Sequence, residues 1–274
     1  MPASVFGTRA FLIKRTQRNR DMDIFASDLD NTLIYSYKRD IGREKVLAEL
    51  YEGREVSYMT ACTYALLDKL CQKLLFVPVT TRSIEQYQRI CFPKQPKIAL
   101  TTNGGVLLVD GIADADWYAQ SKQLAAQAED AMQQAEAILD KDPNRALDVR
   151  RVDGLFVYTK SNHVPETMQR LRDGIDVSAV ELLSNGVKVY VLPRALHKGQ
   201  AVHRLRARFT ENTRVFTAGD SLFDLSLLAA ADIAFCPQAL QYMAREGQQV
   251  ITVDEKQGIF SDVIVQEIAR QIMR

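Results

Sequence analysis

The chain has 274 residues, which is more than one ordinary domain and less than two large ones. Hydrophobic residues make up 47% of the chain and charged residues 25%, values typical of a globular protein with a substantial core. The net charge of +1 provides no overall field for nucleic acid or an acidic membrane, so neither partner is expected. The four cysteines show no C-x-x-C spacing, which favours free thiols, and no apolar stretch is long enough to span a membrane. Both features favour a cytoplasmic protein.

Residues 1–22 are basic and lack both a sustained apolar segment and a small-residue cleavage site. This predicts a flexible tail rather than a signal peptide. Beyond the tail, strand and helix patterns alternate. Strands are predicted at 23–28, 74–79, 97–101 and 106–109, and helices at 57–73 and 83–91.

The middle of the chain has a different pattern. Residues 114–139 are predicted to form one amphipathic helix whose apolar stripe, from Trp117 to Leu139, builds the core of a second domain. Two strands within 147–160, a short helix at 165–173 and a hairpin around Asn185-Gly186 follow. The pattern predicts a small α+β domain with an antiparallel sheet over 112–192.

The alternation resumes after residue 192. Helices are predicted at 198–209, 222–230, 238–245 and 259–273, and strands at 214–218, 232–235 and 250–253. Strands that alternate with helices form a parallel sheet covered on both faces. We therefore predict an α/β core domain made of residues 23–111 and 193–274.

Small, hydroxylic or acidic residues follow the apolar runs of this predicted core. Ligands of open parallel sheets bind at the carboxyl ends of the strands, where these residues would gather. The residues concerned are Asp28, Asp30, Thr32, Thr80, Thr81, Arg82, Thr102, Asn103, Gly104, Gly219, Asp220, Ser221 and Asp224. Lys198, at the start of a predicted helix, is the cation expected to join them from outside the strand ends.

Several carboxylates brought together repel one another strongly, and a hard divalent cation removes the repulsion. Mg²⁺ prefers oxygen ligands and commonly binds carboxylates together with a phosphate. Such an ion would keep Asp28 ionised as a nucleophile, while Asp30 carries a proton. Thr80 and Lys198 would bind the transferring phosphoryl group.

Four short stretches, in this order and spacing, resemble the motifs of the haloacid dehalogenase (HAD) superfamily of phosphohydrolases. They are DLDNT (28–32), VTTRS (79–83), HKGQA (197–201) and GDSLFD (219–224). The insertion between the second and third lies where Cof-like, sucrose-phosphatase-like and mannosylglycerate-phosphatase-like members carry a type-2 (C2) cap. TTNGG at 101–105 is similar to the TNG of those branches. The resemblance implies a Rossmann-like parallel-sheet core with an inserted α+β cap.

The resemblance also implies roles for individual residues. Asp28 is the nucleophile and a metal ligand, and Asp30 is the general acid/base whose backbone carbonyl binds Mg²⁺. Asp220 is the third protein ligand, and Asp224 either binds the metal through water or orients Lys198. The substrate-binding residues are Thr80, Thr81, Arg82, Asn103, Gly104 and Lys198.

Two positions depart from the family pattern. Phe223 stands where Cof-like members usually have Asn, which leaves the role of Asp224 open, and Thr81 stands where many relatives have Gly. On the cap, charged residues are candidates for contact with the leaving group, although exposed charges are commonly just solvated. These candidates are Arg151, Lys160 and Lys188.

The sequence thus predicts a Mg²⁺-dependent phosphatase that hydrolyses a small soluble phosphomonoester, such as a sugar phosphate, through an aspartyl-phosphate. The chain would act as a monomer or homodimer. A phosphomannomutase-like phosphotransferase or phosphomutase of the same fold is an alternative, distinguished by transfer of the phosphoryl group to a second acceptor. A non-catalytic sugar-phosphate-binding module is another, and it would be expected to lack one of the catalytic residues.

Overall fold

The central parallel sheet has the strand order β16-β15-β14-β2-β6, so β2 lies in its middle. The computed structural model of the chain describes residues 6–7, 22–210 and 212–272. The five strands are β2 (Ile24–Ser27), β6 (Leu75–Pro78), β14 (Val215–Ala218), β15 (Ile233–Pro237) and β16 (Gln249–Val253). All of their pairings are parallel, as predicted from the alternation of strands and helices.

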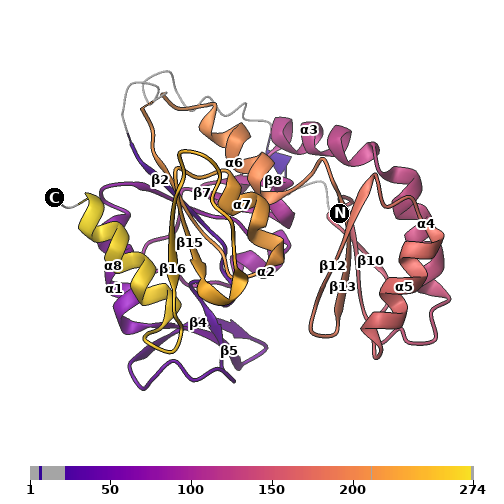
Figure 1. The fold of residues 1–274 in the computed structure, drawn as a ribbon, viewed down its shortest axis with the longest axis horizontal. Coiled ribbons are helices and arrows are strands. Elements are labelled where there is room, and N and C mark those ends of the chain that lie inside the picture. The colour runs from indigo at the N-terminus through magenta and orange to yellow at the C-terminus, as the bar shows by residue number, and fades with distance from the viewer. Residues whose placement is uncertain (1–5, 8–21, 211, 273–274) are drawn as a thin grey trace.

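Alternate residues of each strand contact helices on opposite faces of the sheet. Ile24 and Ala26 pack with α6 (Lys198–Arg206) and α7 (Leu225–Ala229), while Phe25 packs with α1 (Ala61–Leu70) and α8 (Phe260–Ile272). This burial on both faces explains why the strands are continuous apolar runs in the sequence. α2 (Ile84–Gln88) follows β6, and Figure 1 shows the helices around this sheet.

A second, mostly antiparallel sheet extends the core beyond β6. β7 (Ile98–Thr101) continues the parallel arrangement through a bridge between Val79 and Leu100. β8 (Val106–Val109) and β9 (Ile112–Asp114) then follow as antiparallel neighbours. β1 (Phe6–Gly7) pairs in parallel with β9, so these two residues of the predicted tail form a strand. The rest of the tail, apart from Met22, lies outside the described residues.

A three-stranded hairpin sheet, absent from the sequence prediction, follows β2. It contains β3 (Tyr35–Ser36), β4 (Lys45–Tyr51) and β5 (Arg54–Thr60). The predicted helix at 57–73 is therefore wrong for its first turn, because Ser57–Thr60 pair with β4. The helix begins at Ala61, where the Thr60 hydroxyl accepts a hydrogen bond of 3.0 Å from the Thr63 amide.

The inserted segment forms an antiparallel sheet, which we call the cap sheet, with the strand order β10-β11-β13-β12. Its strands are β10 (Arg150–Val152), β11 (Phe156–Lys160), β12 (Val180–Asn185) and β13 (Lys188–Pro193). α4 (Glu129–Asp140) and α5 (Val164–Gly174) pack on one face of it. Figure 1 shows this layer beside the core.

The single long helix predicted at 114–139 is wrong, because the chain breaks at Gln127–Ala128 into α3 (Ala115–Ala126) and α4. Trp117 of α3 packs on the core sheet rather than in the cap. Its indole N–H donates a 3.0 Å hydrogen bond to the Gly104 carbonyl. The Arg204 guanidinium of α6 lies 3.7 Å from the Trp117 ring centroid. The apolar stripe from Trp117 to Leu139 is therefore divided, with α3 packing on the core and α4 on the cap sheet.

Two further features complete the fold. The predicted helix at 238–245 is wrong beyond one 3₁₀ turn, η3 (Gln238–Leu240), because Gln241 adopts a left-handed φ of 50° that ends it. The other 3₁₀ turns, η1 (Thr102–Gly104) and η2 (Leu222–Asp224), follow β7 and β14. Among the described residues, no helix combines the length and apolarity needed to cross a bilayer.

Candidate active site

Three carboxylates converge at the carboxyl edge of the central sheet. Asp28 follows β2 and Asp220 follows β14, and these strands are adjacent, with the Asp28 amide bonded to the Ala218 carbonyl at 2.9 Å. Asp224, one turn further on, completes the group, and one oxygen from each residue lies within 4.8 Å of the others. Asp28 is 6% exposed and Asp224 fully buried, so the cluster is largely removed from water.

Lys198 is buried against this cluster. Its ammonium lies 2.5 Å from Asp28 Oδ1 and 2.7 Å from Asp224 Oδ1. The first turn of α6 carries the lysine, and His197 caps that helix by accepting a 3.1 Å hydrogen bond from the Gln200 amide. α6 approaches α7 so closely that a Cβ on Gly199 would lie 2.1 Å from the Ser226 carbonyl oxygen, so glycine is needed beside Lys198.

Asp224 has partners on both carboxylate oxygens. While Oδ1 accepts from Lys198, Oδ2 accepts from the Asp220 amide, the Ser221 amide and the Ser221 hydroxyl at 3.2, 3.2 and 3.0 Å. The preceding turn folds tightly over this side chain, because a Cβ on Gly219 would lie 2.3 Å from the Asp224 Cβ. Asp224 therefore fixes both the loop after β14 and the position of Lys198.

The cluster carries more negative than positive charge. Burial, followed by repulsion from Asp224, raises the pKa of Asp28 well above its usual value, although Lys198 opposes this shift. Burial and Asp224 also raise the pKa of Asp220 to about 7. Three carboxylates against one ammonium leave two unbalanced charges when all are ionised, and oxygen donors of this kind fit a hard divalent cation.

Asp30 faces a different environment from Asp28. Its carboxylate accepts two hydrogen bonds from Arg82, at 2.8 Å from Nε and 2.7 Å from Nη2. Burial acts to raise the pKa of Asp30, but these bonds and the Arg82 charge lower it below its usual value. Arg82 is itself held by Glu49 of β4 at 2.9 Å, and Glu49 is 2% exposed.

The predicted substrate residues after β6 and β7 lie at the same edge. The Thr80 hydroxyl is buried and accepts a 3.1 Å hydrogen bond from the Arg82 amide, and Thr81 lies between them. Asn103 donates its side-chain amide to the Leu196 carbonyl at 3.0 Å, which ties η1 to the segment before α6. Gly104 lies against α6, where a Cβ would come 2.4 Å from the Ala201 Cβ. Substrate contact by these residues stays a prediction.

The cap sheet presents one face to this edge. β13 and β11 pair Lys188 with Lys160 and Tyr190 with Tyr158, so these four side chains share a face. Burial, Tyr158 and Asp30 raise the pKa of Tyr190 well above its usual value, and the Lys188 charge helps to lower that of Asp30. The Lys188 charge on β13 therefore acts on Asp30 of the core.

Arg151, the third cap candidate, lies on the opposite face of the cap sheet. Its guanidinium forms ion pairs with Glu129 at 2.7 Å and Glu136 at 2.8 Å, both on α4. The prediction that Arg151 is a candidate for contact with the leaving group is wrong, because the alternation of β10 turns it toward the helices. Its partners make it a structural residue of the cap.

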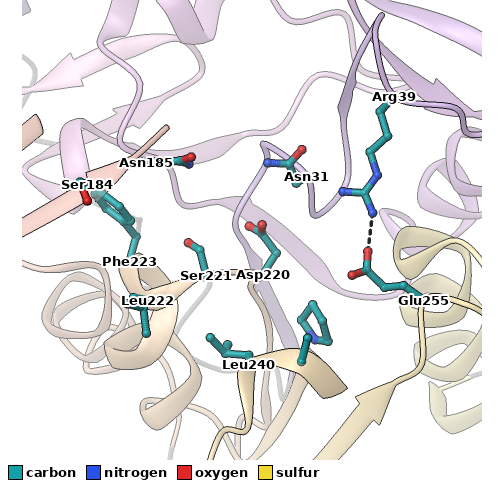
Figure 2. Close-up of a pocket in the computed structure, with 12 residues that line it drawn as sticks. Asn31, Arg39, Ser184, Asn185, Asp220, Ser221, Leu222, Phe223, Leu240 and Glu255 are labelled. Carbon is teal, nitrogen blue, oxygen red and sulfur yellow. Dashed lines mark hydrogen bonds and ion pairs between the residues drawn. The ribbon is translucent and has the colours of Figure 1, made fainter. Parts of the chain in front are cut away.

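A cavity of about 370 Å³ opens beside Asp220, between the cap-sheet hairpin and the loops after β2, β14 and β15. Figure 2 shows Phe223 and Ser184 at one end and the ion pair of Arg39 with Glu255 at the other. The lining residues are Asn31, Arg39, Ser184, Asn185, Asp220, Ser221, Leu222, Phe223, Pro237, Ala239, Leu240 and Glu255. Asp220 is thus the member of the carboxylate cluster that faces the cavity.

Sequence reasoning placed Thr32 at this edge without a role, and it missed two further residues. The Thr32 hydroxyl lies 3.2 Å from Asp28 Oδ2 and 3.4 Å from Asp220 Oδ1. Asn31, with a left-handed φ of 61°, turns the chain into the cavity. Glu49 had no signal in the sequence, because its contact with Arg82 depends on the unpredicted hairpin.

The parallel core, the inserted antiparallel sheet and the acidic edge with its buried lysine define a phosphatase of the HAD superfamily, as the motifs predicted. Within that class, the model of the sucrose-6F-phosphate phosphohydrolase family matches residues 22–236, and the chain belongs to this family. No curated protein sequence matches it.

Solved structures share the fold over nearly the whole chain. The sucrose-phosphatase from Synechocystis, in complex with sucrose and phosphate, has a TM-score of 0.61 and 16% identity, covering 93% of this chain and 99% of its own. The C-terminal domain of trehalose-6-phosphate phosphatase from C. albicans has a TM-score of 0.54 and 13% identity, and the match covers 90% of this chain and 93% of that domain. A trehalose-6-phosphate phosphatase related protein has a TM-score of 0.52 and 17% identity, and the match covers 91% of this chain and 98% of that protein. These similarities confirm the predicted α/β fold.

Proposed function

We propose that this phosphatase is Mg²⁺-dependent and hydrolyses a sugar phosphate, with sucrose 6-phosphate as the first candidate, through an aspartyl-phosphate on Asp28. The observation that carries the proposal is the buried contact of Lys198 with Asp28 and Asp224, next to the carboxylate of Asp220. Family membership and the polar cavity beside Asp220 support a sugar as the leaving group.

The metal ligands in this proposal are the carboxylates of Asp28 and Asp220 and the backbone carbonyl of Asp30. Asp224 orients Lys198, because both of its oxygens already have partners. The Thr32 hydroxyl, within hydrogen-bond distance of Asp28 and Asp220, holds these two carboxylates close to each other. When bound, Mg²⁺ supplies positive charge that keeps the acidic residues ionised and neutralises the phosphoryl oxygens.

The reaction follows from the positions of the chain's own groups. Lys198 and the Thr80 hydroxyl bind phosphoryl oxygens and hold phosphorus in line with an Asp28 oxygen. Asp28 forms a bond to phosphorus as the ester bond breaks, and Asp30 gives its proton to the leaving oxygen. Asp30 then takes a proton from water, which attacks phosphorus and returns Asp28 and inorganic phosphate.

Asp30 must gain a proton before it can act as the acid, since Arg82 holds it ionised. A dianionic phosphate beside Asp30 raises the pKa of that carboxyl by repulsion. We propose that substrate entry shifts Asp30 from its pair with Arg82 toward the leaving oxygen. Arg82, released in part, then faces the substrate.

A phosphate-release assay tests the proposal directly. The full chain with MgCl₂ is expected to release phosphate from sucrose 6-phosphate, with trehalose 6-phosphate and glucose 6-phosphate as competitors in the panel. EDTA should abolish release and added Mg²⁺ should restore it. If no phosphomonoester of a broad panel is hydrolysed, the proposed function is wrong, and if the phosphoryl group appears on a second sugar, the reaction is transfer.

The metal assignment has its own test. Asp220→Asn should raise the Mg²⁺ concentration for half-maximal activity, because one ligand and one charge are lost. Mg²⁺ should also raise the melting temperature of the wild type more than that of Asp220→Asn. Asp148→Asn, at a side chain that is 92% exposed, is the matched control and should respond like the wild type.

A further inference from the structure

Phe223 is the residue at which the fourth motif departs from the pattern that the family resemblance implies, and its backbone is held firmly. It lies between Ser221 and Asp224, whose side chains and amides cap each other in η2. Asp224 is anchored in turn by Lys198. The ring of Phe223 therefore projects from a fixed loop, and it lines the cavity beside Asp220.

The ring of Phe223 packs against the cap sheet rather than against the core. Its centroid lies 5.0 Å from that of Tyr190, with the two planes at 77°, an edge-to-face arrangement. Tyr190 is also in contact with Tyr158 at 5.1 Å and Phe156 at 6.3 Å. Among the residues that the structure describes, Phe223 is thus the single core member of an apolar cluster that otherwise belongs to the cap sheet.

The charges and polar groups that line the rest of the cavity indicate which kind of leaving group it can bind. Arg39 and Glu255 neutralise each other at one end, and Asn31, Asn185 and Ser184 offer uncharged hydrogen-bonding groups. Apart from Asp220, which the proposed mechanism uses, the described lining has no charge without a partner. Such walls match the hydroxyls of an uncharged polyol better than a leaving group with a carboxylate or a second phosphate.

We propose that Phe223 is a specificity-determining residue of this phosphatase. Its contact with Tyr190 docks the cap sheet on the loop after β14 and closes one end of the cavity, so an uncharged polyhydroxylated leaving group is confined between Asn31 and Asn185. This inference rests on the proposed function for its substrate. An asparagine, which the family resemblance implies at this position, could not make this apolar ring contact, whereas Phe223 provides a docking point for the cap.

Small-angle X-ray scattering of the full chain without substrate tests the docking. Phe223→Asn and Tyr190→Ser should each increase the radius of gyration, and the double variant should show no larger increase than either single one. Tyr190→Phe keeps the ring and should match the wild type. Leu225→Ala, an exposed apolar residue of the same segment, is the matched control. Unchanged scattering for Phe223→Asn and Tyr190→Ser, or an additive effect in the double variant, would overturn the docking role.

Kinetics test the effect on specificity. For sucrose 6-phosphate, Phe223→Asn should lower kcat/KM about tenfold, mainly through KM, as expected for loss of an aromatic contact that shapes the bound state. For acetyl phosphate, whose leaving group is too small to fill the cavity, kcat/KM should change less than about twofold. An equal loss for both substrates, or none for either, contradicts the specificity role.

The two experiments separate the two proposals. If the wild type hydrolyses no sugar phosphate, the proposed function fails, while the scattering data still decide whether Phe223 docks the cap. If sucrose 6-phosphate is hydrolysed and Phe223→Asn discriminates against it no more than against acetyl phosphate, only the inference about Phe223 fails.

Discussion

Asp28 and Asp30 are separated by one residue, yet they lie in opposite electrostatic environments. Asp28 is buried with Asp224 and Lys198, and burial raises its pKa. Asp30 has a side chain that is 50% exposed and pairs with Arg82, which lowers its pKa despite burial of the surrounding cleft. Pairs of carboxylates with pKa values driven apart are a common basis for assigning different chemical roles.

The difference comes from what each carboxylate meets across the fold. Asp28 faces residues supplied by α6 and the loop after β14, which are held in place by the close approaches at Gly199 and Gly219. Asp30 faces Arg82, which is held by the hairpin residue Glu49. A rigid, buried environment therefore surrounds the proposed nucleophile, and a more open one surrounds the proposed acid/base.

The largest effect is expected at the buried position. Asp28→Asn removes the nucleophilic oxygen and should lower kcat by about 10⁴-fold or more, because no neighbouring group can replace it in line. Steady-state phosphate release measures the loss. Asp148→Asn, the same exchange at an exposed site, should keep full activity. An Asp28→Asn enzyme with normal kcat would show that the aspartyl-phosphate mechanism is wrong.

Lys198→Met tests the same environment through stability. Removing the ammonium leaves Asp28 and Asp224 buried without a cation and should lower the free energy of unfolding by about 3 kcal/mol without divalent ions. Urea unfolding measures this, and added Mg²⁺ should recover part of the loss. Lys188→Met, at an exposed position, should have little effect on stability. A stable Lys198→Met protein would mean that the cluster is not ionised.

The sequence predicted the buried surroundings of Asp28 better than the more open surroundings of Asp30. The strand-end positions of Asp28, Thr80, Asp220 and Lys198 follow from apolar runs and motif spacing, and the structure brings Asp28, Asp220 and Lys198 together. The hairpin of β4 and β5 has no comparable signal, because residues 57–60 also fit the helical spacing that continues into α1. Glu49 and its hold on Arg82 could therefore not be predicted.

The same limit applies to the cap. Antiparallel pairing was readable from the turn at Asn185-Gly186, and β12 and β13 form as predicted. The split of one apolar stripe into α3 and α4 was not readable, because helical periodicity does not say which layer a turn will contact. Trp117 therefore packs on the core, and Phe223 lies against the cap for reasons that only tertiary contacts reveal.

Arg82→Ala tests the open environment through pH. Without Arg82, burial raises the pKa of Asp30, so this carboxyl keeps to higher pH the proton that it gives to the leaving oxygen. The basic limb of the kcat/KM profile should therefore move to higher pH by about one unit or more. The pair also stabilises the fold above the ordinary Asp pKa of about 4, and this contribution is lost as pH falls through the lowered pKa. Arg89→Ala, which removes a different partner of Glu49, is the control. An unmoved basic limb would show that Asp30 is not the titrating acid.

Glu49→Gln should produce a smaller shift in the same direction. Glutamine keeps the size of the side chain and one acceptor oxygen for Arg82, but it loses the charge that holds the guanidinium against Asp30. Arg82 then spends less time on Asp30, so the Asp30 pKa rises by a fraction of the change in Arg82→Ala. The same pH profile measures it, with Arg89→Ala again as the control. A shift as large as that of Arg82→Ala, or one toward lower pH, would mean that Glu49 acts on the site by a route other than Arg82.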